Sequence, residues 1–272
     1  MKFRGLKFDN GLIGNYEVKK WSHLRNLVVD LMWMSKKQNI VHGFGEIDVT
    51  IPYRIIKDLN KNSSNKISFT GYLIFCLAQA IKEHKYVNAI RKRNKLYIFE
   101  DVDISTIIEK QIGETKFPTN YIIRKANEKS LEEISNEIYI EKYKENFKDK
   151  RSEQIEWFSK LPAFLRHIYW RKLIKNPLFH KQTSGTIGVT AVGMFVNGIG
   201  WAIPLTPKTL TLTVGGIGRR AVQGPNNELL WNDFLSLTFS INHDIIDGGP
   251  AARFINYFGN LLSSGFGLVN RK

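Results

Sequence analysis

The chain has 272 residues, 43% of them hydrophobic, which is enough for one large or two small domains with a sizeable core. This composition excludes a disordered or fibrous chain. Forty basic against 25 acidic residues give a net charge of +15, which is typical of proteins that meet nucleic acid, anionic membranes or phosphate-bearing small molecules. The basic residues are dispersed and follow no zinc-finger or recognition-module spacing, so we expect no nucleic-acid partner.

Cysteine content and hydropathy limit the cellular setting. Cys76 is the only cysteine, and it lies in an apolar run, so disulfides within the chain and cysteine metal sites are excluded. The basic N-terminus lacks the apolar core of a signal peptide, and no segment reaches the roughly 20 apolar residues of a membrane span. We therefore expect a cytoplasmic protein without a metal and without membrane association.

The first third of the chain alternates helices and strands. Residues 1–20 are interpreted as an N-terminal extension, and apolar spacing predicts helices over 21–37 and 70–84. A strand is expected over 44–51, and a helix opened by Pro52 should follow over 52–59. His42 precedes the strand, and its role stays open. Four further histidines are assigned to helix ends or the surface rather than to a ligand site: His23, His84, His167 and His180.

The middle of the chain predicts a hairpin, two more strands and a long helix. A basic turn at 91–95 separates strands near 87–90 and 96–104, and antiparallel strands over 104–109 and 120–124 should continue the meander. Ser130 and Glu133 match the capping-box pattern, in which each side chain bonds a backbone amide of the other residue. A long helix is therefore expected to begin after Ser130.

Residues 139–183 form a charged and then basic-aromatic segment, in which Pro162 and Pro177 bound a helix of ordinary length. Three interpretations remain open: a second helical hairpin packed on its neighbour, a lid over a substrate site, or a helix lying on a membrane surface.

The C-terminal quarter contains the motif with the clearest chemistry. A β-rich run at 235–241 leads into His243-x-x-x-Asp247-Gly248, and Pro250 then opens an apolar-periodic helix. The histidine is thus placed between a strand and the start of a helix. Histidine titrates near neutral pH, so it is the side chain best suited to act as a general base.

This motif resembles the active-site motif of the acyltransferase catalytic domain of 2-oxo-acid dehydrogenase complexes; chloramphenicol acetyltransferase and condensation domains are similar. Residues 185–194 resemble the glycine-rich strand of the first family, in which a Ser or Thr faces the histidine, and Thr190 is the matching residue. Residues 209–217 stand in the place of the family's next central strand. The similarity covers roughly residues 24–262.

The resemblance implies an α/β sandwich of the chloramphenicol acetyltransferase type, with a mixed β-sheet flanked by helices. It also implies one catalytic domain over 21–272, in which about 139–183 is a helical insertion longer than the complex-bound enzymes usually carry. The lipoyl and subunit-binding domains of those enzymes have no counterpart here, so a stand-alone acyltransferase is expected. In these enzymes a neighbouring subunit completes the channel at the histidine, which implies a homotrimer or a larger assembly of trimers.

The implied activity is acyl transfer between coenzyme A and a thiol like dihydrolipoamide, a hydroxyl or an amine, without a covalently bound lipoyl group in this chain. His243 would remove the proton of the incoming nucleophile, and the hydroxyl of Thr190 would stabilise the tetrahedral intermediate. A general positive charge would favour a phosphate-bearing substrate such as coenzyme A. No acyl-enzyme intermediate is required.

Asp247 and Gly248 have supporting roles in this hypothesis. The resemblance implies that Asp247 braces the loop through a salt bridge with an arginine on the N-terminal helix, and Gly248 is expected to allow a conformation that a side chain would prevent. Leu31 occupies the position of that arginine, so Arg25 or Arg124 would have to substitute. This departure, together with Ala191, keeps open the alternative that the domain is a catalytically degenerate scaffold or binding protein.

Overall fold

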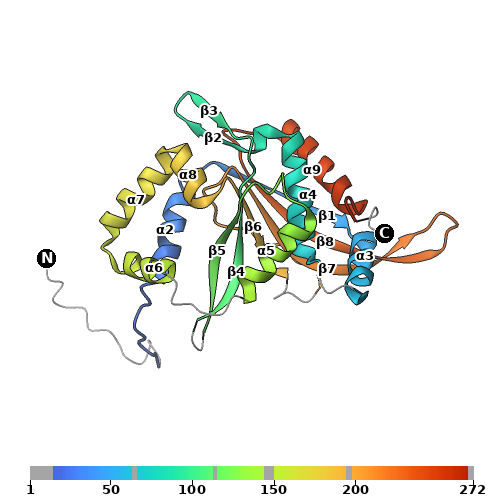
Figure 1. Cartoon of the computed structure of the whole chain (residues 1–272), viewed down its shortest axis with the longest axis horizontal. Coiled ribbons are helices and arrows are strands. Elements are labelled where there is room, and N and C mark those ends of the chain that lie inside the picture. Colours follow the sequence, from blue (N-terminus) through green and yellow to red (C-terminus); the bar gives the residue numbers. More distant parts are fainter. Residues whose placement is uncertain (1–14, 63–65, 113–114, 144–149, 194–197, 269–272) are drawn as a thin grey trace.

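The computed structural model describes residues 15–62, 66–112, 115–143, 150–193 and 198–268. A six-stranded mixed sheet of order β1-β8-β7-β6-β4-β5 forms its centre (Figure 1). Its strands are β1 (Ile40–Asp48), β4 (Ile104–Ile112), β5 (Thr115–Ile123), β6 (Ile187–Ala191), β7 (Leu210–Gln223) and β8 (Leu229–Asn242). β6 pairs in parallel with both β4 and β7, and the other pairs are antiparallel. The expected α/β sandwich with a mixed sheet is confirmed.

Four helices cover one face of the sheet: α3 (Thr50–Asn62), α4 (Phe69–Glu83), α5 (Leu131–Tyr143) and α9 (Gly248–Ser263) (Figure 1). α4 is the central one, and its nearly continuous apolar sequence is buried, including Cys76. Burial raises the pKa of the Cys76 thiol to about 12, so this cysteine is a packing residue. Phe254 and Phe258 of α9 complete the core against Phe239 of the sheet.

The two faces of the central strands differ in polarity because side chains alternate along a strand. Leu210, Leu212 and Val214 of β7 face the helices and belong to the apolar core. Their neighbours Thr211 and Thr213 are equally buried but lie on the opposite face. Hydroxyl residues continue across that face in β8: Ser236, Thr238 and Ser240. A buried polar surface thus lies on the side of the sheet away from α4 and α9.

A second group of helices stands beside the sheet: α2 (Arg25–Ser35), α6 (Lys150–Lys160), α7 (Ala163–Lys175) and α8 (Pro177–Ser184) (Figure 1). α7 is fixed to α2 by a buried ion pair, in which Arg166 Nε donates to Asp30 Oδ2 at 2.7 Å. Trp170 Nε1 donates to the same oxygen at 2.9 Å, and the ring of His167 stacks on Trp33. These contacts favour the helical hairpin packed on its neighbour over the lid and the membrane-surface helix.

Local signals placed most elements correctly. The capping box is present, since Ser130 N donates to Glu133 Oε2 at 2.7 Å and Glu133 N donates to Ser130 Oγ at 3.2 Å. α7 lies between Pro162 and Pro177, as expected. Several boundaries were wrong. The first strand runs over Ile40–Asp48 rather than 44–51, so His42 lies within it. α3 begins at Thr50, because the Asp48 carboxylate accepts hydrogen bonds from the backbone and hydroxyl of Thr50.

Two further expectations need correction. The predicted meander is divided, since β2 (Ala89–Lys92) and β3 (Lys95–Ile98) form a separate two-stranded hairpin and β4 joins the large sheet through β6. His180 is not at the surface; only 4% of it is exposed, because α8 packs against α7 and against β2 of the hairpin. No helix in the described part of the chain is long and apolar enough to cross a membrane.

Candidate active site

His243 lies in a turn between β8 and α9, and the surrounding backbone holds this turn firmly. The His243 amide donates to Asn39 O at 2.8 Å, and the amides of Ile245 and Ile246 both donate to Asn242 O at 3.1 Å. Asn39 Nδ2 donates to Asp244 Oδ1 at 2.9 Å. The His243 side chain is 46% exposed. A fixed backbone therefore presents an accessible imidazole, as a general base requires.

Asp247 does not form the expected buried salt bridge within the chain. Its side chain is 86% exposed, and its Oδ1 lies 4.0 Å from His243 Nδ1. No arginine within the described ranges pairs with it: Arg124 binds Asp103, and Leu31 lies in α2. Asp247 stands one residue before α9, where its carboxylate is free of any capping bond. The carboxylate is thus placed beside the imidazole rather than inside the protein.

Gly248 also departs from its expected role. A Cβ added there would meet nothing within 4 Å, and its φ lies outside the left-handed range. The single chain therefore gives no steric reason for a glycine at this position. The close backbone approach occurs instead at Gly216, where an added Cβ would lie 1.8 Å from Gly198 O. There the chain after β6 crosses a bulge of β7 between Val214 and Ile217.

Thr190 lies near the end of β6 on the polar face of the sheet. Val189 and Ala191 pack into the apolar core, so the alternation along β6 places Thr190 on the other side. The register puts it level with Thr213 of β7 and Thr238 of β8. The hydroxyls of those two threonines are buried and have no hydrogen-bond partner among the described residues. The partly buried Thr190 thus stands beside a row of buried hydroxyls.

The structure does not bring Thr190 and His243 together within one chain. Thr190 is level with Thr238, two strands away, and His243 lies five residues beyond Thr238 along the direction of β8. At about 3.4 Å per residue and 4.8 Å per strand, their Cα atoms are about 20 Å apart. The expected contact between the hydroxyl and the imidazole is therefore impossible inside a single copy.

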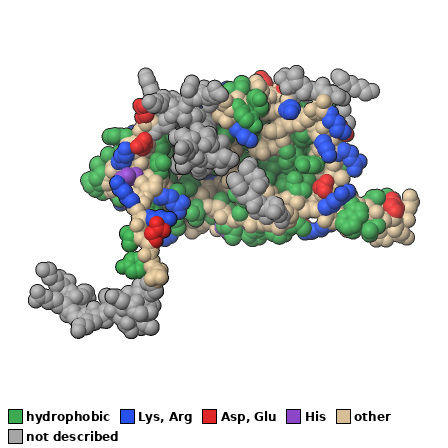
Figure 2. Space-filling model, turned by 90° about the horizontal axis from the view of Figure 1, so that it is seen from below, with side chains coloured by type: hydrophobic (Ala, Val, Ile, Leu, Met, Phe, Trp, Pro, Cys, Tyr) green, Lys and Arg blue, Asp and Glu red, His purple; other side chains and the backbone are tan. Residues whose placement is uncertain are grey.

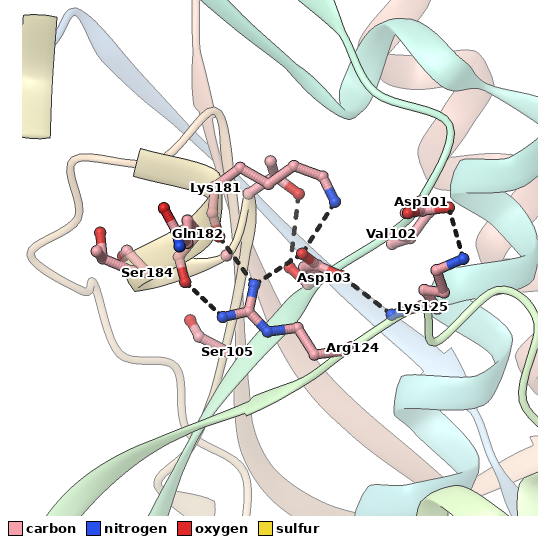
Figure 3. A network of polar contacts seen from close by, with 12 residues as sticks. Asp101, Val102, Asp103, Ser105, Arg124, Lys125, Lys181, Gln182 and Ser184 are labelled. Carbon is pink, nitrogen blue, oxygen red and sulfur yellow. Dashed lines mark hydrogen bonds and ion pairs between the residues drawn. The ribbon is translucent and has the colours of Figure 1, made fainter. Parts of the chain in front are cut away.

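A network around Asp103, which the sequence did not indicate, fixes the beginning of β6 (Figure 3). The Asp103 carboxylate accepts hydrogen bonds from Arg124 Nη1 and Lys181 Nζ, both at 2.9 Å, and from Lys125 N at 3.0 Å. Burial alone would raise the pKa of Asp103, but these donors together lower it. The Asp103 carbonyl accepts from Thr186 N at 3.0 Å, so the network ties α8 and β5 to the strand that carries Thr190.

Two more buried titratable groups, His180 of α8 and Lys208 before β7, lie close enough to each other to interact electrostatically. Lys208 Nζ donates to Ser184 Oγ at 3.0 Å and to Gly185 O at 3.2 Å. Burial, with a smaller effect from Arg124, lowers the pKa of Lys208 to about 7. Burial, assisted by Lys208, lowers the pKa of His180 to about 3, so its imidazole is neutral near pH 7. Their side chains gave no sequence signal, because burial depends on distant segments.

The donor chemistry of this region favours proton transfer by side chains. Among the described residues, no three His, Cys, Asp or Glu side chains gather where a metal ion would bind. The turn instead offers an imidazole, a neighbouring carboxylate and an open approach. Lys and Arg side chains gather toward the ends of the face seen in Figure 2.

Residues 14–156 and 174–267 match the model of the 2-oxoacid dehydrogenases acyltransferase (catalytic domain) family. The chain belongs to this family. The family assignment makes it an acyltransferase catalytic domain, and it confirms the resemblance drawn from the His243 motif. The residues between the two matched ranges, 157–173, include most of α7.

Curated relatives agree with this assignment. The chain is 24% identical over 243 residues to the dihydrolipoyllysine-residue acetyltransferase component of the pyruvate dehydrogenase complex of Rickettsia typhi, covering 87% of this chain and 52% of that protein. It is 24% identical over 247 residues to the lipoamide acyltransferase component of the branched-chain alpha-keto acid dehydrogenase complex of Bacillus subtilis, covering 89% and 51%. The chain thus spans about half the length of these relatives.

Solved structures show the same fold. A probable dihydrolipoamide acetyltransferase from Listeria monocytogenes superposes with a TM-score of 0.69 at 22% identity, covering 96% of this chain and 99% of that one. The cubic core of a pyruvate dehydrogenase multienzyme complex superposes with a TM-score of 0.70 at 17% identity, covering 97% and 98%. The acyltransferase domain therefore shares the chain fold of these two proteins.

Proposed function

We propose that this domain transfers an acyl group between coenzyme A and a thiol acceptor of the dihydrolipoamide kind, with His243 as the general base. The observation that carries the proposal is the fixed turn after β8, which presents a half-exposed imidazole at the position of the family's histidine motif. A thiol is favoured over a hydroxyl or amine because the curated relatives are named for dihydrolipoyllysine and lipoamide.

The chemistry follows from the residues of the turn. The neutral His243 imidazole accepts the proton of the attacking thiol, and the thiolate adds to the thioester carbonyl. A hydroxyl donor stabilises the oxyanion of the tetrahedral intermediate, and we assign that donor to Thr190. The imidazolium then returns its proton to the departing thiolate. The sulfur–carbon bond formed replaces the one broken, so no acyl-enzyme is needed.

Asp247 takes a different role from the expected brace. Its carboxylate, 4.0 Å from His243 Nδ1, is close enough to stabilise the imidazolium and bias its orientation. In a solved Azotobacter vinelandii dihydrolipoamide acetyltransferase, a serine, a histidine and an asparagine were investigated for roles in the catalytic mechanism, and the asparagine lies four positions after the histidine. A neutral amide at position 247 is therefore compatible with the same chemistry.

The separation of Thr190 and His243 supports an active site that forms between two copies of the chain. Since the two Cα atoms are about 20 Å apart in one chain, their contact requires Thr190 of one copy and His243 of another. Exposed apolar side chains are available for such a contact on the edge strand β1, on the chain after β6 and on the β7–β8 hairpin: Val41, Phe44, Ile203, Leu229 and Trp231. A homotrimer of the acyltransferase domain is the proposed active form.

The direct test is release of coenzyme A from a panel of acyl-CoA thioesters, measured as free thiol with and without dihydrolipoamide. A thiol acceptor adds its own signal, so loss of the acceptor's thiol and gain of coenzyme A are separated chromatographically. Acceptor-dependent release is expected. Its absence across the panel would instead support a catalytically degenerate scaffold.

The shared site is tested by mixing two inactive chains, His243→Ala and Thr190→Ala. Co-expression gives mixed trimers in which about a quarter of the sites combine an intact His243 with an intact Thr190 from different chains. Recovery of activity near that fraction is expected, whereas separately purified variants should stay inactive. No recovery in mixed trimers, or a monomer by light scattering at micromolar concentration, contradicts a site shared between copies.

A further inference from the structure

A small cavity of about 230 Å³ adjoins the turn that carries His243. Asn242 and Asp244, on either side of the histidine, form part of its wall, and Thr209 at the start of β7 forms another part. The remaining polar lining comes from Gln38, from Arg91 and Arg93 of the β2–β3 hairpin and from His180 of α8. This volume suits a terminal group of a ligand rather than a whole cofactor.

The charge around the cavity is positive. Arg91 and Arg93 are exposed, and the same turn carries Lys92 and Lys95, so four of five consecutive residues are cations. The opposing charge is the carboxylate of Asp244, which accepts from Asn39 and lies 3.7 Å from Arg91 Nη1. Two arginines on the wall therefore outweigh one carboxylate that is already partnered.

Arg93 occupies a backbone conformation that an arginine rarely adopts. Its φ is +54°, in the left-handed region that favours glycine or asparagine. A glycine at this turn would relieve the strain. The turn nevertheless holds an arginine, and Arg91 Nε donates to the Arg93 carbonyl at 3.1 Å, which links the two guanidinium-bearing residues.

His180 gives an independent indication of a ligand. It is only 4% exposed, it lines the cavity, and its Nε2 has no hydrogen-bond partner among the described residues. A buried polar atom without a partner lowers the stability of a protein, so such an atom is usually satisfied by another protein group, by water or by a ligand. A neutral imidazole can donate one hydrogen bond to an oxygen of an anion.

We propose that this cavity binds the anionic group, a phosphate or a carboxylate, of a small-molecule substrate and so positions that substrate beside His243. The inference rests on the proposed acyl transfer and specifies its substrate class. Arg91 and Arg93 supply the charge-assisted hydrogen bonds, and His180 supplies a buried donor. The anion enters from the side of the hairpin, where both arginines are exposed.

Direct binding to the assembled protein is the first measurement. Isothermal titration calorimetry with coenzyme A, dephospho-coenzyme A, acetyl-coenzyme A and succinyl-coenzyme A compares the wild type with the double variant Arg91→Gln/Arg93→Gln. Affinity for the ligand whose anionic group uses the cavity should fall by about 10-fold or more. The matched control is Lys92→Gln/Lys95→Gln, which removes two charges from the same hairpin outside the cavity and should change affinity by about 2-fold or less.

The choice of ligands separates the two anions. If the phosphate occupies the cavity, the wild type prefers coenzyme A to dephospho-coenzyme A, and the arginine variant loses that preference. If an acyl carboxylate occupies it, the variant loses a preference for succinyl-coenzyme A over acetyl-coenzyme A. Equal losses in the arginine and lysine variants, or no loss of either preference, would overturn the inference.

A second variant distinguishes a ligand site from a structural one. His180→Leu removes the unpartnered nitrogen at similar volume, so the melting temperature of the ligand-free protein should stay the same or rise while anion affinity falls. Arg93→Gly should likewise melt higher and bind more weakly. Unchanged affinity in His180→Leu would contradict the role of the imidazole.

The anion site and the proposed acyl transfer can be contradicted independently of each other. If the wild type shows no acyl transfer but binds coenzyme A in an arginine-dependent manner, the proposed function is wrong and the anion site stands. If the wild type turns over and the arginine variant keeps the same KM for every substrate, the anion site is wrong and the proposed function stands.

Discussion

The turn after β8 and the contact between α2 and α7 each contain an aspartate, and the two carboxylates lie in opposite environments. Asp247 is 86% exposed and has only the His243 imidazole nearby, whereas the Asp30 side chain is 1% exposed and accepts from Arg166 and Trp170. The family resemblance led us to expect a buried ion pair at the histidine motif. In the described part of the chain, a buried ion pair instead joins Asp30 of α2 to Arg166 of α7, which lies in the helical insertion.

This difference in burial assigns the two carboxylates different roles, one in stability and one in chemistry. A buried, fully paired carboxylate holds two helices together, and its loss leaves uncompensated charge in the interior. An exposed carboxylate contributes little to folding but remains available to a substrate or to a second copy of the chain. Substitutions at the turn after β8 should therefore lower activity and leave the melting temperature nearly unchanged. Substitutions at the contact between α2 and α7 should lower the melting temperature.

The largest effect on activity is expected for His243→Ala. If the imidazole is the general base, kcat should fall by about 10²–10⁴-fold while the affinity for coenzyme A changes little. Thermal unfolding should be unchanged, because the ring is half exposed and only the backbone amide of His243 is held. Acceptor-dependent release of coenzyme A is the assay, and near wild-type turnover would remove the basis of the acyltransferase mechanism.

The largest effect on stability is expected for Asp30→Ala. Arg166 would remain buried without its partner, which should lower the free energy of unfolding by about 3–5 kcal/mol. The double variant Asp30→Leu/Arg166→Met is the control, since replacing both charges by apolar groups should recover much of the loss. Denaturant unfolding measures both. An equally unstable double variant would show that packing at this contact, rather than the unpaired charge, sets its stability.

Thr190 tests the part of the site that another copy would supply. Thr190→Ala should reduce kcat by about 10²–10³-fold, whereas Thr190→Ser keeps the hydroxyl and should retain most activity. Both substitutions remove the γ-methyl group of Thr190, and its loss can destabilise β6. Melting curves therefore accompany the kinetics and separate this effect from loss of the hydroxyl. Equal losses of activity in both variants at unchanged stability would mean that the hydroxyl is not the oxyanion donor.

The smallest effect is expected for Asp247→Asn. Because the side chain is 86% exposed and has no arginine partner in the described part of the chain, the free energy of unfolding should change by about 0.5 kcal/mol or less. Activity should fall modestly, as the amide cannot stabilise the imidazolium as well as the carboxylate does. A large drop in melting temperature, greatest in the assembled protein, would reveal a salt bridge between copies.

The sequence by itself determined the features that depend on near neighbours along the chain. The capping box at Ser130, the proline boundaries of α7, the apolar helix around Cys76 and the strand before His243 all arise from periodicity or from bonds within a few residues. The His243 motif also lies within a few consecutive residues, so the sequence alone could indicate the acyltransferase family.

Only the tertiary structure decided which side chains are buried and what they contact. Asp30 meets Arg166 across 136 positions, β4 joins β6 in parallel, and His180 becomes buried because α8 docks against distant segments. The register of β6, β7 and β8 keeps Thr190 and His243 apart. Contacts between segments so distant in the chain arise from packing of the whole domain, which no short sequence pattern encodes.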